Sequence, residues 1–259
     1  DATEQGRPIY LPLGFHDLYR IARWHFESAR EAVAPPAGIS IRRFAVADLP
    51  RLATYDRPLS GIRVLDLGRV LAAPWTAQML GDLGADVIKI ERPGLGDEGR
   101  QYGPVYIRDA EGNRTAESAL YIAGNRNKRS LTLNIAHPRG QQVIRDLVKT
   151  CDVLVENFKV GALAKYGLDY ASLKAVNPRL IYCSITGYGQ SGPYAKRPGY
   201  DAIFQAEGGL MSVTGVRDGE PGAGPMKVGP SIVDVMTGYN AAIGILAALR
   251  HRDATGEGQ

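Results

Sequence analysis

Cysteine and histidine are scarce in this sequence. The 259 residues contain two cysteines, Cys151 and Cys183, and four histidines. Two cysteines cannot build a disulfide framework, and no Cys-x-x-Cys pair suggests zinc. No His, Asp or Glu residues stand at ligand spacing, so we expect no metal site. No histidine lies in a Gly-x-Ser-x-Gly or Cys–His context, which argues against a serine or cysteine hydrolase.

Long apolar runs and a strong net charge are also lacking. No run approaches the ~20 residues that span a bilayer, and the first ten residues lack the pattern of a secretory signal. We therefore expect a cytoplasmic protein with no membrane partner. The 31 Lys and Arg exceed the 27 Asp and Glu by four, too few to indicate nucleic-acid binding. Basic groups at residues 126–129 and 196–197 could bind a phosphorylated small molecule.

From Pro58 onward, strand-like and helix-like segments alternate. The patterns predict strands over residues 62–67, 86–90, 153–155 and 180–185, and helices over 75–83, 138–150, 200–210 and 232–250. Residues 94–115 are predicted to form a polar loop. This alternation predicts an α/β fold with a parallel sheet and helices on both faces. Residues 1–57 form a separate extension, with a predicted helix over 19–33 and no recognisable chemistry.

The first strand–helix–strand unit has the outline of a dinucleotide-binding fold, with Glu91 where a ribose-binding carboxylate would stand. However, the turn over residues 68–74 reads GRVLAAP, with one glycine where three are needed. This argues against nicotinamide or flavin binding. Glycine-rich segments at 187–192 and 219–224 do not match a phosphate loop. They predict either surface turns or a flexible lip over an active site.

One carboxylate stands out. Asp234 lies near the start of an apolar predicted helix, just after Gly229-Pro230-Ser231. A helix N-terminus favours a negative charge, so we expect a low pKa for this carboxyl group. The side chain could be a simple capping acid or a carboxylate nucleophile.

Several segments together resemble one known family. They are residues 58–67 (PLSGIRVLDL), 83–94 (LGADVIKIERPG), 127–130 (NKRS), 155–158 (VENF), 184–193 (SITGYGQSGP) and 198–201 (PGYD). Over residues 58–259 the chain resembles the large domain of class III coenzyme A transferases, without their small domain. The resemblance implies a Rossmann-like large domain, an interlocked homodimer, and acyl-CoA and carboxylic acid substrates. It implies no permanently bound cofactor.

The resemblance also implies roles for particular residues. It places the covalent nucleophile at Asp234, with Tyr200 and Asp201 lining the active site. For coenzyme A it points to Arg69, Val70, Leu71, Ala72, Arg92, Leu133, Asn157, Phe158 and Lys165, with Lys128 and Arg129 as assisting cations.

Two positions depart from close relatives of that family. Leu71 stands where formyl-CoA transferases have a glutamine, which favours a larger dicarboxylic acyl group, such as succinyl-CoA. Tyr200 stands where α-methylacyl-CoA racemases have a histidine base. A phenol with a pKa of about 10 is a poor base at neutral pH. Racemase activity remains an alternative, as does a coenzyme A-binding portion of a fusion that has no activity.

Overall fold

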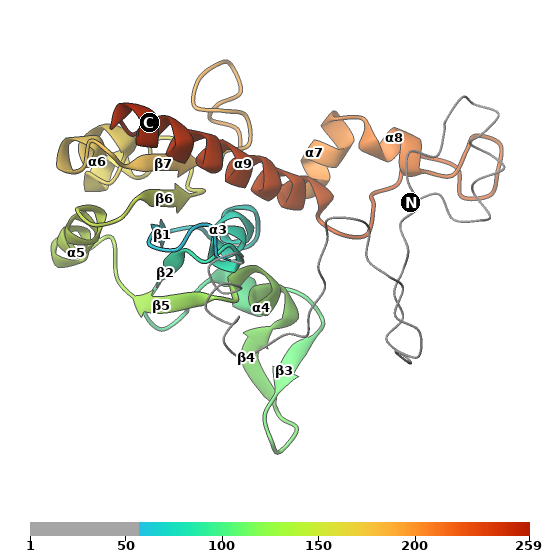
Figure 1. Cartoon of the computed structure of the whole chain (residues 1–259). Helices are drawn as coiled ribbons and strands as arrows, with labels where there is room; N and C mark the ends of the chain where they lie inside the picture. The colour runs from blue at the N-terminus through green and yellow to red at the C-terminus, as the bar shows by residue number, and fades with distance from the viewer. Residues whose placement is uncertain (1–56) are drawn as a thin grey trace, which may run out of the picture. The chain divides into compact units, whose positions relative to one another are not determined.

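The computed structural model describes residues 57–259, and the helix predicted over residues 19–33 lies outside them. Five strands form one sheet: β1 (Arg63–Asp66), β2 (Asp86–Glu91), β5 (Lys128–Thr132), β6 (Val153–Glu156) and β7 (Ile181–Ser184). Their order is β5-β2-β1-β6-β7, and every pairing is parallel (Figure 1). The predicted α/β fold with a parallel sheet is confirmed.

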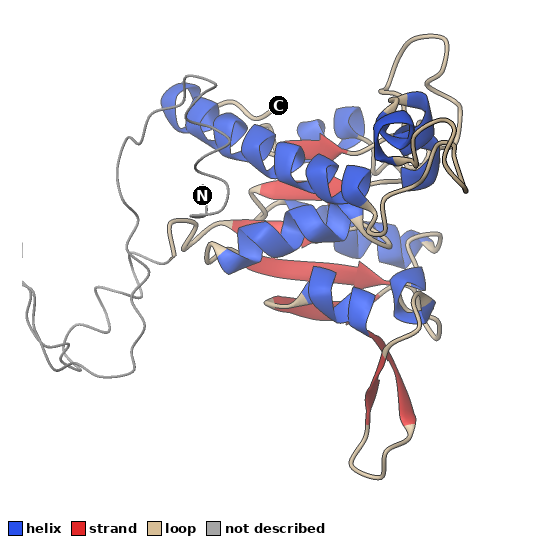
Figure 2. Ribbon diagram, turned by 90° about the vertical axis from the view of Figure 1, so that its right-hand side faces the viewer, coloured by secondary structure: helices blue, strands red, loops and turns tan. Residues whose placement is uncertain are grey.

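Helices cover both faces of this sheet (Figure 2). α3 (Ala72–Asp82) and α9 (Ile232–Thr255) pack on one face, and α5 (Pro138–Val148) and α6 (Tyr170–Val176) on the other. Successive strand residues point to opposite faces, so Val64 joins the core under α3 and α9 while Leu65 joins the core under α5 and α6. Both side chains are fully buried, which explains why the strands are apolar without alternation.

The polar loop expected over residues 94–115 is wrong. That stretch contains η3 (Glu98–Gln101) and a hairpin of β3 (Tyr106–Arg108) and β4 (Arg114–Ser118) that points away from the sheet in Figure 1. α4 (Ala119–Asn125) and edge strand β5 follow. The hairpin is largely exposed, and β5 reads KRSLT, so neither gave the apolar signal on which strand prediction depends. The remaining elements are η4 (Ala164–Tyr166), α7 (Asp201–Glu207) and α8 (Leu210–Thr214).

The expectation that no apolar run is long enough to span a bilayer is wrong for helix α9. It is long and apolar enough to cross a membrane by length and composition, and 28% of its most apolar stretch is buried. Its C-terminal half nevertheless packs in the core through Ile245, Ala248 and Leu249, as the core helix of a globular domain does. The apolar side chains left exposed on α9 are Met236, Tyr239, Ile243 and Leu246.

The strand order fixes where a ligand would bind. From β1 the chain moves outward to β2 and β5, then returns to the other side of β1 to form β6 and β7. In such sheets, ligands bind outside the carboxyl ends of the strands, where the direction of winding reverses. Here that point lies between the loops that follow β1 and β6.

Candidate active site

A cavity of about 370 Å³ opens at the carboxyl ends of β1, β2, β5 and β6. Among the residues that line it are five of the nine predicted coenzyme A contacts: Arg69, Arg92, Leu133, Phe158 and Lys165. These residues come from four different strand-end loops, so the folded sheet is what brings them together. The other four predicted contacts, Val70, Leu71, Ala72 and Asn157, do not line this cavity.

Cations and apolar surface share the cavity wall. The Arg69 guanidinium lies 4.5 Å from the centre of the Phe158 ring and pairs with Glu98 at 3.4 Å. Lys165 lies 4.7 Å from the Tyr166 ring centre. Flat apolar surfaces next to guanidinium and ammonium groups suit a ligand that carries both an aromatic base and phosphates.

The loop between β1 and α3 is not a phosphate cradle, because protein side chains already hold its amides. Asp66 Oδ1 accepts from the Gly68 N–H at 2.7 Å, and Asp97 Oδ1 accepts from the Val70 N–H at 2.9 Å. Asn157 accepts from the Arg69 N–H and donates to the Arg69 carbonyl, both at 2.9 Å. The missing glycines therefore correspond to a loop that is fixed by side chains. The Asn157 amide is itself occupied in fixing it.

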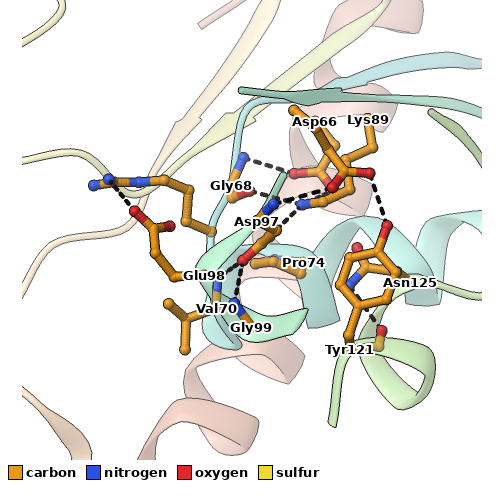
Figure 3. Close-up of polar contacts among 12 residues, drawn as sticks. Asp66, Gly68, Val70, Pro74, Lys89, Asp97, Glu98, Gly99, Tyr121 and Asn125 are labelled. Atoms are coloured by element: carbon orange, nitrogen blue, oxygen red, sulfur yellow. Dashed lines mark hydrogen bonds and ion pairs between the residues drawn. The ribbon is translucent and has the colours of Figure 1, made fainter. Parts of the chain in front are cut away.

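Beneath this loop lie four buried charged side chains, of which Figure 3 labels Asp66, Lys89 and Asp97. Sequence analysis named only the fourth, Lys128. Lys89 Nζ lies 2.7 Å from Asp97 Oδ2 and 3.8 Å from Asp66 Oδ2, and Lys128 Nζ lies 2.8 Å from Asp66 Oδ2. Burial opposes the charge on Lys89, but the neighbouring carboxylates outweigh it and raise its pKa. Burial dominates at Lys128 and lowers its pKa to about 8. Both lysines are therefore charged at neutral pH.

Glu91, the residue at the ribose-binding position of dinucleotide-binding folds, is fully occupied. It accepts from Arg100 at 2.8 and 2.9 Å, from the Tyr121 hydroxyl at 2.8 Å and from the Ser130 hydroxyl at 2.7 Å. Although burial works in the opposite direction, these hydrogen bonds lower the pKa of Glu91 to about 2. A carboxylate with this many donors has no lone pair to offer a ribose hydroxyl.

The basic group at residues 126–129 has partners within the fold. Arg126 pairs with Asp82 at 2.5 Å and Arg129 with Asp86 at 2.6 Å, while Lys128 is buried against Asp66. These carboxylates belong to α3, β2 and β1. None of the three basic side chains lines the cavity, so the binding of a phosphorylated molecule by this group stays a prediction.

Asp234 lies in the first turn of α9 and is half-buried. The N-terminus of α9 is capped by Asp201, which lies 33 positions before Asp234, because Ser231 makes no side-chain cap. Asp201 Oδ1 accepts from the Val233 N–H at 2.8 Å and from the Asp234 N–H at 3.4 Å, the two amides that an N-cap usually serves. Asp201 is itself 6% exposed, so it holds the turn that carries Asp234.

The pKa of Asp234 is opposite in direction to the expectation from the helix terminus. Burial, and after it the charge of Asp201, raise the pKa of Asp234 to about 6. The expected low pKa was wrong mainly because the fold partly buries this carboxyl group, and also because the helix end is completed by the negatively charged Asp201. Among residues 57–259, no hydrogen bond involves the Asp234 carboxylate oxygens. A half-buried, weakly solvated carboxylate is a better nucleophile than a hydrogen-bonded one.

The helix crossing that carries Asp234 is tight. Gly238 lies one turn after Asp234, and a Cβ there would stand 3.0 Å from Trp75 Cδ1 and 3.2 Å from the Ala72 carbonyl oxygen. Ala72 begins α3, directly after the Arg69–Leu71 segment. The crossing therefore brings the turn of Asp234 to the end of the β1–α3 loop, although Asp234 does not line the cavity itself.

Tyr200 and Leu71 differ in exposure. Tyr200 precedes α7 and is 75% exposed, whereas Leu71 is 6% exposed at the start of α3.

The Gly187–Gly192 segment packs on α7 through Tyr188. The Tyr188 ring centre lies 5.3 Å from that of Phe204, and the Tyr188 hydroxyl donates to Glu207 at 2.7 Å. This aromatic contact anchors the segment on one side.

Neither cysteine is prepared for thiolate chemistry. Burial raises the pKa of Cys151 to about 11 and that of Cys183 to about 12. Within residues 57–259, no group of three or more His, Cys, Asp or Glu side chains is placed to hold a metal ion.

Comparison with known proteins gives a consistent result. A family model described as CoA-transferase family III matches residues 59–259. A succinate–glutarate CoA-transferase from Agrobacterium fabrum is 53% identical over 202 residues, 78% of this chain and 49% of that protein. The human succinyl-CoA:glutarate CoA-transferase is 45% identical over 78% of this chain and 44% of its own length. This chain therefore spans about half the length of the curated relatives it matches.

A solved structure agrees. The crystal structure of a CAIB/BAIF family protein from Brucella suis is 50% identical, with a TM-score of 0.72 over 79% of this chain and 52% of that one. A further relative, the β subunit of a succinyl-CoA–L-malate CoA-transferase from Chloroflexus aurantiacus, is 45% identical over 80% of this chain and 48% of its own length.

Proposed function

Because this chain belongs to the family III CoA-transferases, an enzyme family that transfers coenzyme A, we propose that the complete protein moves coenzyme A from succinyl-CoA to a dicarboxylic acid through a covalent intermediate on Asp234. The observation that carries the proposal is the half-buried Asp234 carboxylate, which makes no hydrogen bond within residues 57–259, on a helix end held by Asp201. The substrate class follows from the names of the relatives, which act on succinyl-CoA or succinate with glutarate or malate.

The chemistry conserves acyl activation. An Asp234 oxygen attacks the thioester carbonyl, the C–S bond breaks, and a mixed anhydride and coenzyme A thiolate form. The thiolate then attacks the aspartyl carbonyl, the anhydride C–O bond breaks, and the free donor acid leaves. An acceptor carboxylate repeats both steps in reverse and departs as the new thioester. Dividing the transfer in this way is covalent catalysis.

The surroundings of Asp234 suit these steps. Its raised pKa still leaves it mostly ionised at neutral pH, and partial burial leaves its charge poorly solvated. The developing oxyanion needs backbone N–H donors. At the start of α3 the Ala72 and Ala73 N–H groups have no acceptor within the helix, whereas Pro74 has no N–H and the Trp75 N–H donates to the Leu71 carbonyl. The cavity behind the β1–α3 loop would hold the nucleotide end of coenzyme A against Arg69, Arg92 and Lys165.

The direct experiment traps the intermediate. The longest natural form of the protein is incubated with succinyl-CoA and hydroxylamine, and peptide mass spectrometry should find a hydroxamate at Asp234. Asp234→Asn should lower the transfer rate by on the order of a thousandfold or more. Asp253→Asn on the same helix is the matched control, since Asp253 is exposed and far along α9. An Asp234→Asn protein that still transfers coenzyme A would refute the mechanism.

The same preparation separates the alternatives. A racemase would introduce solvent deuterium at the α-carbon of a 2-methylacyl-CoA, whereas a transferase leaves that carbon unexchanged. A protein that binds coenzyme A without either reaction would be a binding module.

We also propose a homodimer. Support comes from the stripe on α9 formed by Met236, Tyr239, Ile243 and Leu246, which is apolar and exposed between 38% and 63%. A continuous apolar stripe at helical spacing is typical of a surface that another chain covers.

A further inference from the structure

The mechanism above leaves one unusual feature of the molecule unused. Four charged side chains, Asp66, Lys89, Asp97 and Lys128, are buried together beneath residues 68–71, each 2% exposed or less. We refer to them as the loop cluster. Burying charges is costly, and a matched buried set seldom adds stability compared with apolar packing. The contacts that the set makes with the backbone indicate what it does.

Asp97 uses both carboxylate oxygens. Its Oδ1 accepts from the Val70 N–H at 2.9 Å and from the Gly99 N–H at 2.7 Å, while its Oδ2 faces Lys89 Nζ at 2.7 Å. Asp97 follows β2 and Val70 follows β1, so this contact ties the β1–α3 loop to the next strand end. Figure 3 shows Asp97 between Val70, Gly99 and Lys89.

Lys89 and Asp66 both hydrogen-bond to the backbone of Gly68, two residues before Val70. Lys89 Nζ donates to the Gly68 carbonyl at 2.8 Å, and Asp66 Oδ1 accepts from the Gly68 N–H at 2.7 Å. Lys128 Nζ, from β5, donates to Asp66 Oδ2 and to the Pro74 carbonyl, both at 2.8 Å. The loop cluster thus connects β1, β2 and β5 to Gly68 at the start of the loop and to Pro74 in the first turn of α3.

Val70 has a backbone conformation that needs such support. Its φ is +65°, in the left-handed region, which a β-branched residue rarely adopts and which costs conformational energy. A strained residue persists only where its surroundings over-determine it. Among residues 57–259, the hydrogen bond from the Val70 N–H to Asp97 is the one that acts directly on this residue.

We propose that Asp97, charge-balanced by Lys89, is a positioning residue that holds Val70 in its left-handed conformation and so keeps the adjacent Arg69 on the cavity wall, where it binds coenzyme A. The proposal rests on the proposed function, in which Arg69 contacts coenzyme A. It assigns the loop cluster to ligand positioning, in contrast to Asp201, which positions the nucleophile.

Asp97→Asn is the informative variant. Asparagine has one acceptor oxygen, so its NH2 group must face either the Lys89 ammonium or the Val70 and Gly99 N–H groups, and one set of contacts is lost. Isothermal calorimetry with coenzyme A should give a dissociation constant raised about tenfold, the effect of one or two lost hydrogen bonds. Asp109→Asn is the matched control, since Asp109 accepts from the Asn113 N–H at 2.7 Å in the exposed β3–β4 turn. Wild-type affinity in Asp97→Asn would overturn the proposal.

A second substitution separates positioning from general destabilisation. Glycine adopts the left-handed conformation without strain, so Val70→Gly in the Asp97→Asn background should restore most of the affinity for coenzyme A. It should do so without restoring the melting temperature. A purely structural Asp97 would give a double variant that binds no better than Asp97→Asn, which contradicts the proposal.

Two further measurements cover the remaining cases. If Asp97→Asn does not fold, Asp97→Glu decides. It keeps the negative charge beside Lys89, but its longer side chain moves the oxygens away from the Val70 N–H, so the dissociation constant for coenzyme A should rise about tenfold. Wild-type affinity in Asp97→Glu would overturn the proposal. If wild type shows no binding heat, the proposed function fails at this site. Hydrogen exchange at the Val70 amide then still tests the inference, which requires at least about tenfold faster exchange in Asp97→Asn than in Asp109→Asn.

Discussion

The Asp201–Asp234 pair illustrates how one residue changes the chemistry of another 33 positions away. Asp201 stabilises the first turn of α9 by accepting from its amides. Burial raises the pKa of Asp234, and the charge of the same Asp201 carboxylate raises it further. The side chain that builds the helix end therefore adds to the effect of burial in making the adjacent carboxylate less stable as an anion. The pair combines structural order with local electrostatic strain, which is common at functional sites.

The raised pKa of Asp234 predicts a pH-dependent gain in stability on its replacement. Because the folded state binds this proton more tightly than the unfolded state, the stability contribution of Asp234 falls as pH rises from about 4 to about 6, and stays low above that. Asp234→Asn should therefore raise the free energy of unfolding at pH 7 by about 1–2 kcal/mol, allowing for partial exposure. Urea unfolding should show this gain at pH 7 and none near pH 3.5. Asp253→Asn should show no such gain, and a loss of stability in Asp234→Asn at pH 7 would contradict the pKa shift.

Ionisation of Asp234 should also appear in the rate. We expect the rate of formation of the proposed aspartyl intermediate to rise about tenfold per pH unit below pH 6 and to level off above it, because in the proposed mechanism the carboxylate attacks in its ionised form. Rapid-quench measurement of the first turnover between pH 4.5 and 8 checks this. A profile without an inflection near pH 6 would show that another group controls the step.

At this scale, sequence predicted some residues of the site and missed others for a clear reason. Arg69, Arg92, Leu133, Phe158 and Lys165 came from the resemblance, and the structure places all five around one cavity. Asp97 carried no signal, because its partner amide is 27 positions away and its own segment reads as a polar loop. Neighbours that only the folded sheet brings together are invisible to local patterns.

Among the elements, α3 and α9 matter most, because their crossing connects the β1–α3 loop to the turn of Asp234. The crossing is close: Thr76 Oγ1 lies 3.3 Å from the Gly238 carbonyl oxygen, and Gly238 leaves no room for a methyl group beside Trp75. Glycine is required here for contact between helices, since its backbone conformation is an ordinary helical one.

This crossing predicts opposite effects for two glycines of the same helix. Gly238→Ala should lower the free energy of unfolding by about 1–3 kcal/mol through overpacking, and should reduce activity by moving Asp234. Gly244→Ala should raise stability by about 0.5–1 kcal/mol, because a Cβ there meets nothing within 4 Å and alanine favours the helix. Chemical denaturation of both variants measures the difference. Equal changes in the free energy of unfolding would mean that the α3–α9 crossing has room for a methyl group at Gly238.

Elements with apolar patterns were predicted with nearly correct bounds, and polar elements were not. The predicted strand over 86–90 is β2 (Asp86–Glu91), and the predicted helix over 138–150 is α5 (Pro138–Val148). Edge strand β5 was missed because one side of it faces solvent and its two leading residues, Lys128 and Arg129, form ion pairs. A strand held by charge pairs has no apolar periodicity to detect.

At the scale of the whole molecule, the exposed apolar stripe of α9 is the surface that most needs a partner to cover it. Its C-terminal half belongs to the core, but its exposed stripe leaves apolar area in contact with water. Soluble proteins rarely leave continuous apolar stripes uncovered, which is the basis of the proposed homodimer. The covering surface could not be predicted from sequence, because periodicity indicates which face is apolar and not what lies against it.

The dimer predicts a change in mass from one substitution. Ile243 is 63% exposed at the middle of the stripe, and Ile243→Glu should weaken self-association by on the order of a hundredfold. Sedimentation velocity should then find a dimer for wild type and a monomer for the variant. Val213→Glu is the control, since Val213 is 78% exposed on α8 and outside the stripe. A monomeric wild type would contradict the proposal.

The capping of α9 by Asp201 has a consequence for how such an enzyme can diversify. Gln205, one turn after Asp201, accepts from the Val228 N–H at 3.0 Å, so the chain between them is closed at its base by contacts independent of what lies in between. Loop closure costs little more when a loop grows. Insertions and replacements between residues 215 and 226 would therefore leave the first turn of α9, and the proposed nucleophile Asp234 on it, in place.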